Sequence, residues 1–242
     1  MRMEKNASLL FRRTVDINDD IHVLIPTVGE ILDFGEDDYY TLVSTITAMP
    51  IDMMAELDDV GVDFTQISDY ELFLIMFNGI KGSDTSLIFD NLDLSGFEAA
   101  INKENDEIVL FDKTTGIVID RSIHNMIASA LRKIHHLEKN TKRPGNDEAK
   151  AYLIERAKLK RKRKRRSRKS SELEGLIVAM VNTEEFKYKF NEVKDLTIYQ
   201  FNECVKQIIK KVDYNNRMIG VYSGTVDAKQ ISQDDLNWLI HK

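Results

Sequence analysis

The chain contains little cysteine and no long apolar run, and each shortage excludes a class of protein. Cys204 is the only cysteine among the 242 residues, so no disulfide can form within the chain, as suits a reducing cytoplasm. We expect it to be a small buried side chain on a helix. No apolar run approaches the roughly 18 residues of a membrane helix. The opening stretch MRMEKNASLL lacks the apolar segment of a secretory signal. These features predict a cytoplasmic protein with no membrane partner.

Motifs for metal binding and catalysis are also missing. His135 and His136 are adjacent, so on a helix they point about 100° apart and cannot share one ion. We expect them, and His124, to be solvated or flanking side chains. The glycine-containing stretch 78–86 lacks the Gly-Lys-Ser/Thr ending of a phosphate-binding loop. The acidic segment 102–113 lacks the glycine and the final glutamate of a calcium loop. We therefore predict a protein that is not an enzyme, with no catalytic residue, no cofactor and no metal.

Charge is distributed very unevenly along the chain, although the formal net charge is only −6. Residues 1–120 hold 25 Asp and Glu against 7 Lys and Arg, a net charge of −18. Residues 121–170 hold 4 against 18, a net charge of +14, and residues 171–242 hold 11 against 9, a net charge of −2. Such asymmetry concerns partners and solubility more than fold. The basic middle has a potential acidic partner in its own N-terminal third.

Short apolar runs and turn signals predict a mixed N-terminal segment. The runs LLFRRTVDI and IHVLIP, separated by Asn18-Asp19-Asp20, predict a hairpin or a pair of edge strands. Capping boxes that begin at Thr27 and Ser68 predict two helix starts, and the second helix should be buried on most sides. From about residue 85 the β-branched runs SLIFDNLDL, EIVLFD and GIVIDR predict strands. The loop 113–116, which ends in glycine, should join the last two strands as a hairpin.

The remainder of the chain predicts helices. Helix 121–139 carries one apolar stripe at helical spacing: Ile123, Ile127, Leu131, Ile134 and Leu137. A second helix, capped by Asn146, is amphipathic at its front and strongly basic at its back. Further capping boxes begin at Ser171 and Thr197, and the end reads as a glycine-containing loop from residue 214 plus a short helix bearing Trp238.

These patterns predict an α+β fold that is mostly helical, in three parts. Residues 1–120 form an acidic α+β domain with short hairpins, and residues 121–170 form a helical pair that ends in a basic arm. Residues 171–242 form a small helical domain.

The basic arm, KLKRKRKRRSRKSS over 158–171, is the candidate partner-binding site. Its ten cations are Lys158, Lys160, Arg161, Lys162, Arg163, Lys164, Arg165, Arg166, Arg168 and Lys169. Ten like charges repel one another, so the arm needs counter-charge to be helical. A solvated linker, an acidic protein surface, a nucleic-acid backbone and, in a eukaryote, a nuclear-import signal are all compatible with it. We expect it to prefer acidic protein, in its own N-terminal third or in another copy, because no aromatic residue interrupts it for base stacking.

Several stretches along nearly the whole chain resemble one family. They are IHVLIPTVGEILDFGEDDYY, DYELFLIMF, FKYKFNEVKDLTIYQFNECVKQIIKK, GVYSG and LNWLI. The succession resembles proteins of the tail gene module of phages of Gram-positive bacteria, which are taken for tail assembly chaperones. The resemblance implies a noncatalytic viral protein in the host cytoplasm that coats the tape-measure polypeptide and recruits tail-tube subunits. The alternatives are a structural protein of the virion from the same module and a nonspecific nucleic-acid-binding protein that uses the arm.

Overall fold

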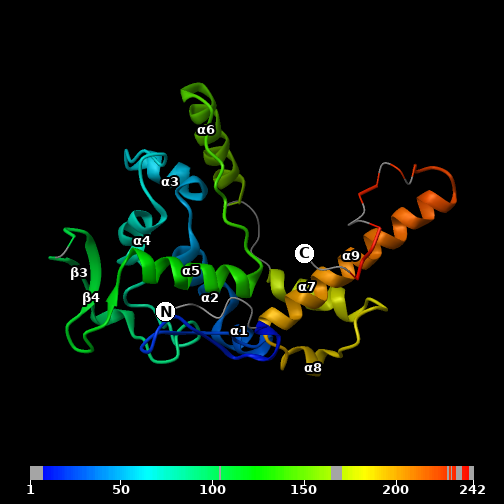
Figure 1. The fold of residues 1–242 in the computed structure, drawn as a ribbon, viewed down its shortest axis with the longest axis horizontal. Helices are drawn as coiled ribbons and strands as arrows, with labels where there is room; N and C mark the ends of the chain where they lie inside the picture. The colour runs from blue at the N-terminus through cyan, green and yellow to red at the C-terminus, as the bar shows by residue number, and fades with distance from the viewer. Residues whose placement is uncertain are drawn as a thin grey trace.

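The computed structural model describes residues 8–103, 105–164, 171–227, 229, 231–232 and 236–239. Helices dominate, with two small antiparallel sheets, so the fold is α+β and mostly helical as predicted. Two parts project from a common body in Figure 1: helix α6 (Asp147–Lys164) beside α3 (Met54–Asp59), and the C-terminal half of α9 (Ile198–Tyr222).

The N-terminal hairpin forms as predicted. Strands β1 (Thr14–Asp16) and β2 (His22–Leu24) pair antiparallel, with Val15 opposite Val23. The side chain of Asn18 closes the turn by accepting hydrogen bonds from the backbone N–H groups of Asp20 and Ile21 at 3.0 and 2.7 Å. Asparagine at this position therefore fixes the turn that the Asn-Asp-Asp sequence predicts.

The two predicted capping boxes of the N-terminal segment are confirmed. Thr27 and Glu30 exchange hydrogen bonds at the start of α1 (Val28–Phe34), which ends at Gly35, where φ is 105°. Helix α2 (Glu36–Thr47) follows, and the short 3₁₀ helix Pro50–Met53 leads into α3. The second box starts α4 (Asp69–Phe77), whose Tyr70, Leu72, Phe73 and Phe77 are buried.

One β prediction is wrong and one strand was missed. Residues 86–93 form turns and irregular backbone that lead into the 3₁₀ helix Leu94–Gly96, and only an isolated β-bridge between Phe89 and Val23 stands where a strand was predicted. The segment is apolar because Ile88 and Phe89 enter the core from a loop, while the Thr85 hydroxyl donates to the carbonyl of Leu92 at 3.1 Å. Strand β3 (Phe97–Ile101) follows and pairs with β4 (Ile108–Asp112), which pairs with β5 (Val118–Ile119) through the predicted hairpin.

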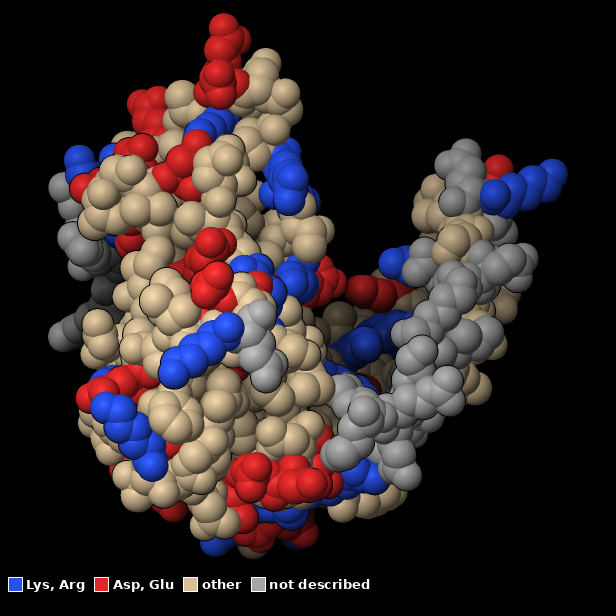
Figure 2. All heavy atoms as spheres, turned by 60° about the vertical axis from the view of Figure 1, so that its left-hand side comes forward, with Lys and Arg blue, Asp and Glu red and all other residues tan. Residues whose placement is uncertain are grey.

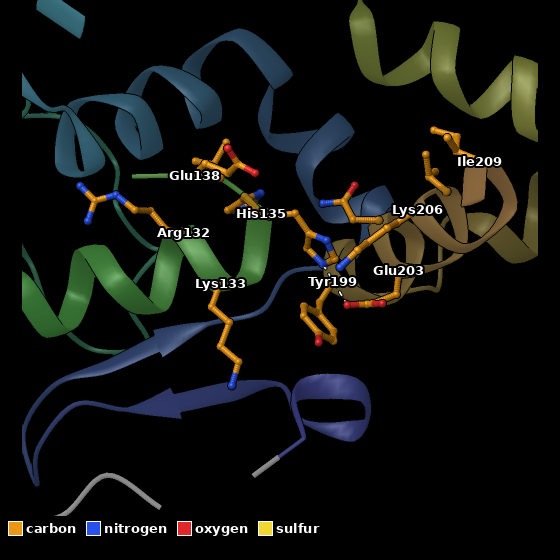
Figure 3. Close-up of a pocket in the computed structure, with 12 residues that line it drawn as sticks. Arg132, Lys133, His135, Glu138, Tyr199, Glu203, Lys206 and Ile209 are labelled. Carbon is orange, nitrogen blue, oxygen red and sulfur yellow. Dashed lines mark ion pairs between the residues drawn. The ribbon is translucent and has the colours of Figure 1, made fainter. Parts of the chain in front are cut away.

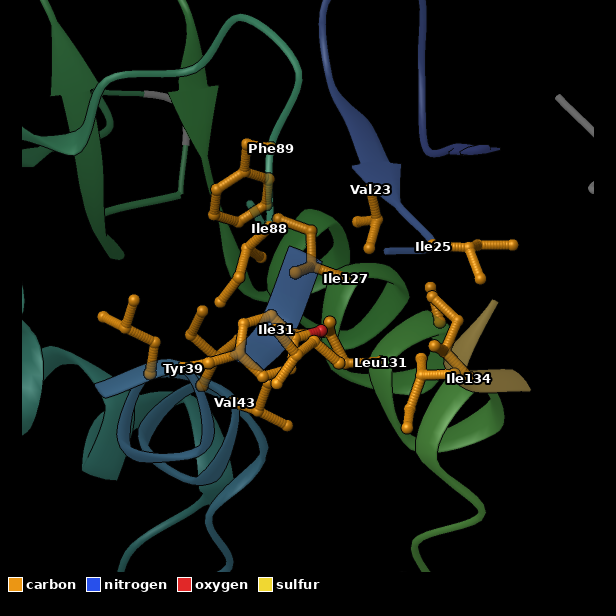
Figure 4. Packing of buried hydrophobic residues seen from close by; sticks show 14 of the residues in the cluster. Val23, Ile25, Ile31, Tyr39, Val43, Ile88, Phe89, Ile127, Leu131 and Ile134 are labelled. Atoms are coloured by element: carbon orange, nitrogen blue, oxygen red, sulfur yellow. The ribbon is translucent and has the colours of Figure 1, made fainter. Parts of the chain in front are cut away.

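Helix α5 (Arg121–His135) lies at the centre of the core. Its apolar stripe packs against α2, α4, α9 and β2. Figure 4 shows Ile127, Leu131 and Ile134 among side chains of β2, α1, α2 and the loop that carries Ile88 and Phe89. The helix ends at His136, which adopts left-handed geometry with φ of 55°. The predicted stripe therefore stops at Ile134, and Leu137 lies outside the helix, 44% exposed.

The C-terminal helices are α7 (Glu172–Val181), α8 (Phe190–Val193) and α9. Ser171 caps α7 by accepting from the N–H of Glu174, and the full capping box at Thr197 starts α9. The loop predicted from residue 214 is wrong, because α9 continues to Tyr222. A single glycine, Gly220, inside a helix costs only about 1 kcal/mol and does not end it. The predicted last helix around Trp238 falls largely outside the described residues.

One hydrophobic cluster draws on all three predicted segments, with Val23, Leu131 and Phe201 all buried in it. A second, smaller cluster of Ile51, Leu57, Phe64 and Leu72 lies beneath α3, and Ile154 of α6 packs against it. The division at residues 120 and 170 stays a prediction.

Candidate protein-binding site

The structure divides the basic arm. Five of its cations lie on α6 and have side chains that the structure describes: Lys158, Lys160, Arg161, Lys162 and Arg163. Lys164 is the last residue of α6, and its side chain falls outside the described part. The remaining four cations lie outside the described residues altogether: Arg165, Arg166, Arg168 and Lys169.

Two arm cations meet carboxylates of the short helix α3. The Lys158 ammonium lies 2.6 Å from a carboxylate oxygen of Asp58 and 2.9 Å from one of Asp59. The Arg161 guanidinium lies 2.5 Å from Asp59 and 3.3 Å from Glu56. These carboxylates supply the counter-charge that a strongly basic helix needs.

The pairing changes the proton affinity of both partners. Hydrogen bonds from Lys158 and Arg161 hold the pKa of Asp59 below its usual value. A hydrogen bond to Asp58 raises the pKa of Lys158, and one to Asp59 raises that of Arg161. About two turns earlier on α6, the Lys150 ammonium lies 2.5 Å from a carboxylate oxygen of Asp63, and its hydrogen bond lowers the pKa of that carboxyl to about 2. Asp59, Asp63, Lys158 and Arg161 therefore stay ionised across the physiological range.

A groove lies where the end of α5 meets the first turns of α9. Its volume is about 690 Å³, within the range of binding clefts. The sequence did not reveal this groove, because its walls come from segments about 65 residues apart. Figure 3 shows the α5 side of the groove, with Lys133 and Glu138, opposite the α9 side, with Tyr199, Glu203 and Lys206.

The groove combines apolar surface with charges of both signs. Leu137 and Ile209 line it and are 44% and 56% exposed, so a partner could cover them. The imidazole Nε2 of His136 lies 3.4 Å from a carboxylate oxygen of Glu203, an ion pair across the groove when the imidazole is protonated. The lining thus combines the charged side chains Glu203, Lys206, Lys133 and Glu138 with apolar ones, as in a site that binds an amphipathic helix.

The apolar face of α9 continues beyond the groove. Its residues alternate at spacings of three and four, as in a heptad repeat: Ile198, Phe201, Val205, Ile208, Val212, Asn215, Ile219 and Tyr222. The first two are fully buried in the core, whereas Ile219 and Tyr222 are 66% and 87% exposed. The stripe, which Asn215 interrupts, thus leaves the core, passes the groove and ends in solvent.

The sequence predicts that the histidines are solvated or flanking side chains, and this prediction is wrong for His124 and His135. His124 and His135 of α5 are buried, with 1% and 7% of their surface exposed. Among the described residues, no three His, Cys, Asp or Glu side chains come together as a metal-ligand set. Cys204 lies half-buried on α9 against the core, and burial raises the pKa of its thiol. These side chains serve packing.

The acidic surface is spread over several elements. Figure 2 shows Asp and Glu side chains gathered at the lower edge and the upper tip of one face, with Lys and Arg between them. Within the described ranges, no helix combines the length and apolarity that crossing a membrane requires.

Comparison with known protein families gives a match in the C-terminal part of the chain. Residues 162–241 match a family model described as the YomV second domain, which is a phage-associated family named from a Bacillus phage region. The match covers 80 of 242 residues and includes α7, α8 and α9. It supports a phage protein of a Gram-positive host. Neither the curated proteins nor the solved structures contain a match.

Proposed function

We propose that the protein is a noncatalytic tail assembly protein of a phage that infects Gram-positive bacteria. In this role it binds the tape-measure polypeptide in the host cytoplasm, keeps it soluble and recruits tail-tube subunits. The phage-associated match over 162–241 supports the phage setting, and the resemblance of the chain to tail-module proteins supports the specific role.

The observation that carries the proposal is the apolar stripe of α9 beside the groove. A soluble protein rarely leaves a continuous apolar surface uncovered unless a partner covers it. The stripe occupies eight positions along the helix and passes the groove at Val205, beside Leu137 and Ile209, while its exposed end lies farther along the helix at Ile219 and Tyr222. This geometry fits a helical partner that lies along α9 with its own apolar face toward the stripe.

The charges around the groove suit such a partner. Lys133 and Lys206 on one hand, and Glu138 and Glu203 on the other, offer pairs to a helix with mixed charge on its flanks. A tape-measure polypeptide is expected to present amphipathic helices before the tail tube encloses them. Covering their apolar faces prevents the polypeptide from aggregating.

Co-expression tests the proposal. The tape-measure protein of the same phage is produced alone, with the intact chain, and with a variant carrying Ile219→Asp and Tyr222→Asp on α9. The intact chain should move most of the tape-measure protein into the soluble fraction and co-purify with it, and the variant should do neither. An equally insoluble tape-measure protein in all three cultures contradicts the proposed role.

A further inference from the structure

Helix α6 has two long faces, and only one of them contacts the rest of the described chain. The inner face carries Lys150, Ile154, Lys158 and Arg161, which recur at helical spacing. Figure 1 shows α6 standing beside α3, away from the body of the molecule. The outer face is therefore open over its length.

The inner face shows how α6 binds an acidic helix. Ile154 packs against the small apolar cluster beneath α3, while Lys158 and Arg161 reach carboxylates at 2.5–3.3 Å. On this face α6 therefore binds its neighbour through an apolar contact at Ile154, with cations on either side that pair with carboxylates. Helix α3 supplies the matching pattern, with buried Leu57 between Glu56 and the Asp58-Asp59 pair.

The outer face repeats this composition. Tyr152 and Leu159 are seven residues apart, on one side of the helix, and are 62% and 51% exposed. Arg156, Lys160 and Arg163 flank them. Together with Glu155 these side chains border a hollow of about 470 Å³ on the surface of α6. Within the described ranges, Arg156, Lys160 and Arg163 form neither an ion pair nor a side-chain hydrogen bond, in contrast to the inner row.

We propose that the outer face of α6 is a second docking site, and that its occupant is an acidic amphipathic helix of another protein. Such a helix would cover Tyr152 and Leu159 with its apolar stripe and pair its carboxylates with Arg156, Lys160 and Arg163. Arginine forms bidentate hydrogen bonds with carboxylates and with phosphates, so the exposed apolar side chains Tyr152 and Leu159 are what favour an amphipathic helix. A nucleic-acid backbone would pair with the cations but leave Leu159 uncovered. The inference does not depend on the groove beside α9 or on the proposed phage role.

Binding of synthetic helices to the full-length protein tests the site. The probe is a labelled amphipathic peptide of about 18 residues, with leucines in one stripe and glutamates on its flanks. One matched peptide replaces every glutamate by lysine, and another keeps the composition but scatters the leucines. Fluorescence anisotropy should show at least roughly tenfold tighter binding of the probe than of either matched peptide. Equal binding of all three peptides overturns the proposal.

Two variants with the same net charge locate the binding face. The outer variant carries Arg156→Gln and Arg163→Gln, and the inner variant carries Lys158→Gln and Arg161→Gln. The outer variant should lose roughly tenfold or more in affinity for the probe while its melting temperature stays that of the intact protein. The affinity of the inner variant for the probe should stay within about threefold of that of the intact protein. Equal losses in both variants would mean that only net charge matters, which contradicts a defined outer site.

The same measurement with a DNA duplex of about 30 base pairs separates the two classes of acidic partner. The acidic helix should bind more tightly than the duplex at equal salt concentration. Tighter binding of the duplex, lost in the outer variant, would assign the outer face to nucleic acid and overturn the proposal.

Discussion

Two buried imidazoles connect α5 to the helices packed on it. The His124 Nε2–H donates to the carbonyl of Ile46 at 3.1 Å, and its ring stacks on Phe73 with centroids 4.4 Å apart. His135 Nε2 shares a hydrogen bond of 2.9 Å with the Tyr39 hydroxyl. Burial lowers the pKa of both histidines to about 4, because a charged imidazole would lose its hydration in the core. Both rings are therefore neutral near pH 7.

Stability should consequently fall as the pH drops from about 6.5 to about 4. In this window the unfolded chain binds protons at His124 and His135, whereas the folded chain does not. The loss is up to roughly 3 kcal/mol for each imidazole, given pKa values of about 4 in the folded state. Above pH 6.5 the stabilisation is fully present. Urea unfolding across this range measures the slope.

The variant His124→Gln separates the histidine contribution from that of the carboxylates. It removes one titrating group and keeps a hydrogen-bond donor for the Ile46 carbonyl. Its free energy of unfolding should depend less steeply on pH between 6.5 and 4 than that of the intact protein. Parallel curves for both proteins would show that His124 does not titrate in the unfolding reaction.

At the scale of single elements, one carboxylate joins two helices that are far apart in sequence. Glu36, in the first turn of α2, accepts backbone hydrogen bonds from Glu172 and Leu173 of α7 at 3.1 and 2.9 Å, and it also accepts from the Ser171 hydroxyl. A carboxylate at a helix N-terminus satisfies unpaired N–H groups and interacts favourably with the helix dipole.

Glu36→Ala should therefore destabilise the protein by about 1–2 kcal/mol. The matched control is Asp38→Ala, which removes an equal charge from the same turn of α2 and, within the described part of the chain, forms no hydrogen bond or ion pair with α7. Chemical denaturation of both variants measures the difference. An equal loss of unfolding free energy in both variants would mean that the charge at the N-terminus of α2, and not the contact with α7, causes the destabilisation.

Alanine substitution at Gly29 tests the close contact between α1 and the segment before α9, and Gly175 of α7 provides the control. The Gly29 N–H donates to the carbonyl of Lys194 at 2.9 Å, and a Cβ at Gly29 would lie 3.0 Å from that oxygen. Gly29→Ala should be destabilising, although alanine favours helices by about 1 kcal/mol. Gly175→Ala, in α7 with open space around it, should stabilise by up to about 1 kcal/mol in the same thermal unfolding measurement. A stabilising Gly29→Ala contradicts the close approach.

Local signals account for the elements that sequence predicts correctly. The capping boxes at Thr27, Ser68 and Thr197 and the stripe Ile123–Ile134 depend on residues within a few turns of one another. The failed strand over 86–94 is apolar for a tertiary reason, since Ile88 and Phe89 fill the core from a loop. Apolar composition alone does not separate a strand from such a loop.

In the candidate sites, too, the sequence predicts local features but not those that depend on tertiary packing. Sequence identified the cations of the arm, but it could not tell which of them face α3, because that depends on how α6 packs. Because the sequence predicts a loop from residue 214, it does not reveal that Ile219 and Tyr222 extend the apolar stripe of α9. The heptad spacing from Ile198 to Tyr222 was the signal that could have revealed it.

At the scale of the whole molecule, one core carries two projecting helices with different surface chemistry. Helix α6 presents cations around Tyr152 and Leu159, whereas the outer half of α9 presents a mainly apolar stripe. Both leave the body where partners can reach them (Figure 1). This arrangement suits a protein that holds other proteins together during assembly.

The most direct test of the central claim is the affinity of the groove beside α9 for a helical segment of the tape-measure protein. Isothermal titration calorimetry compares the intact chain with Ile209→Asp in the groove and with Ile75→Asp, a similarly exposed position on α4. The account predicts binding by the intact chain and by Ile75→Asp, with at least roughly tenfold weaker binding by Ile209→Asp. No binding by the intact chain, or equal binding by all three proteins, would contradict it.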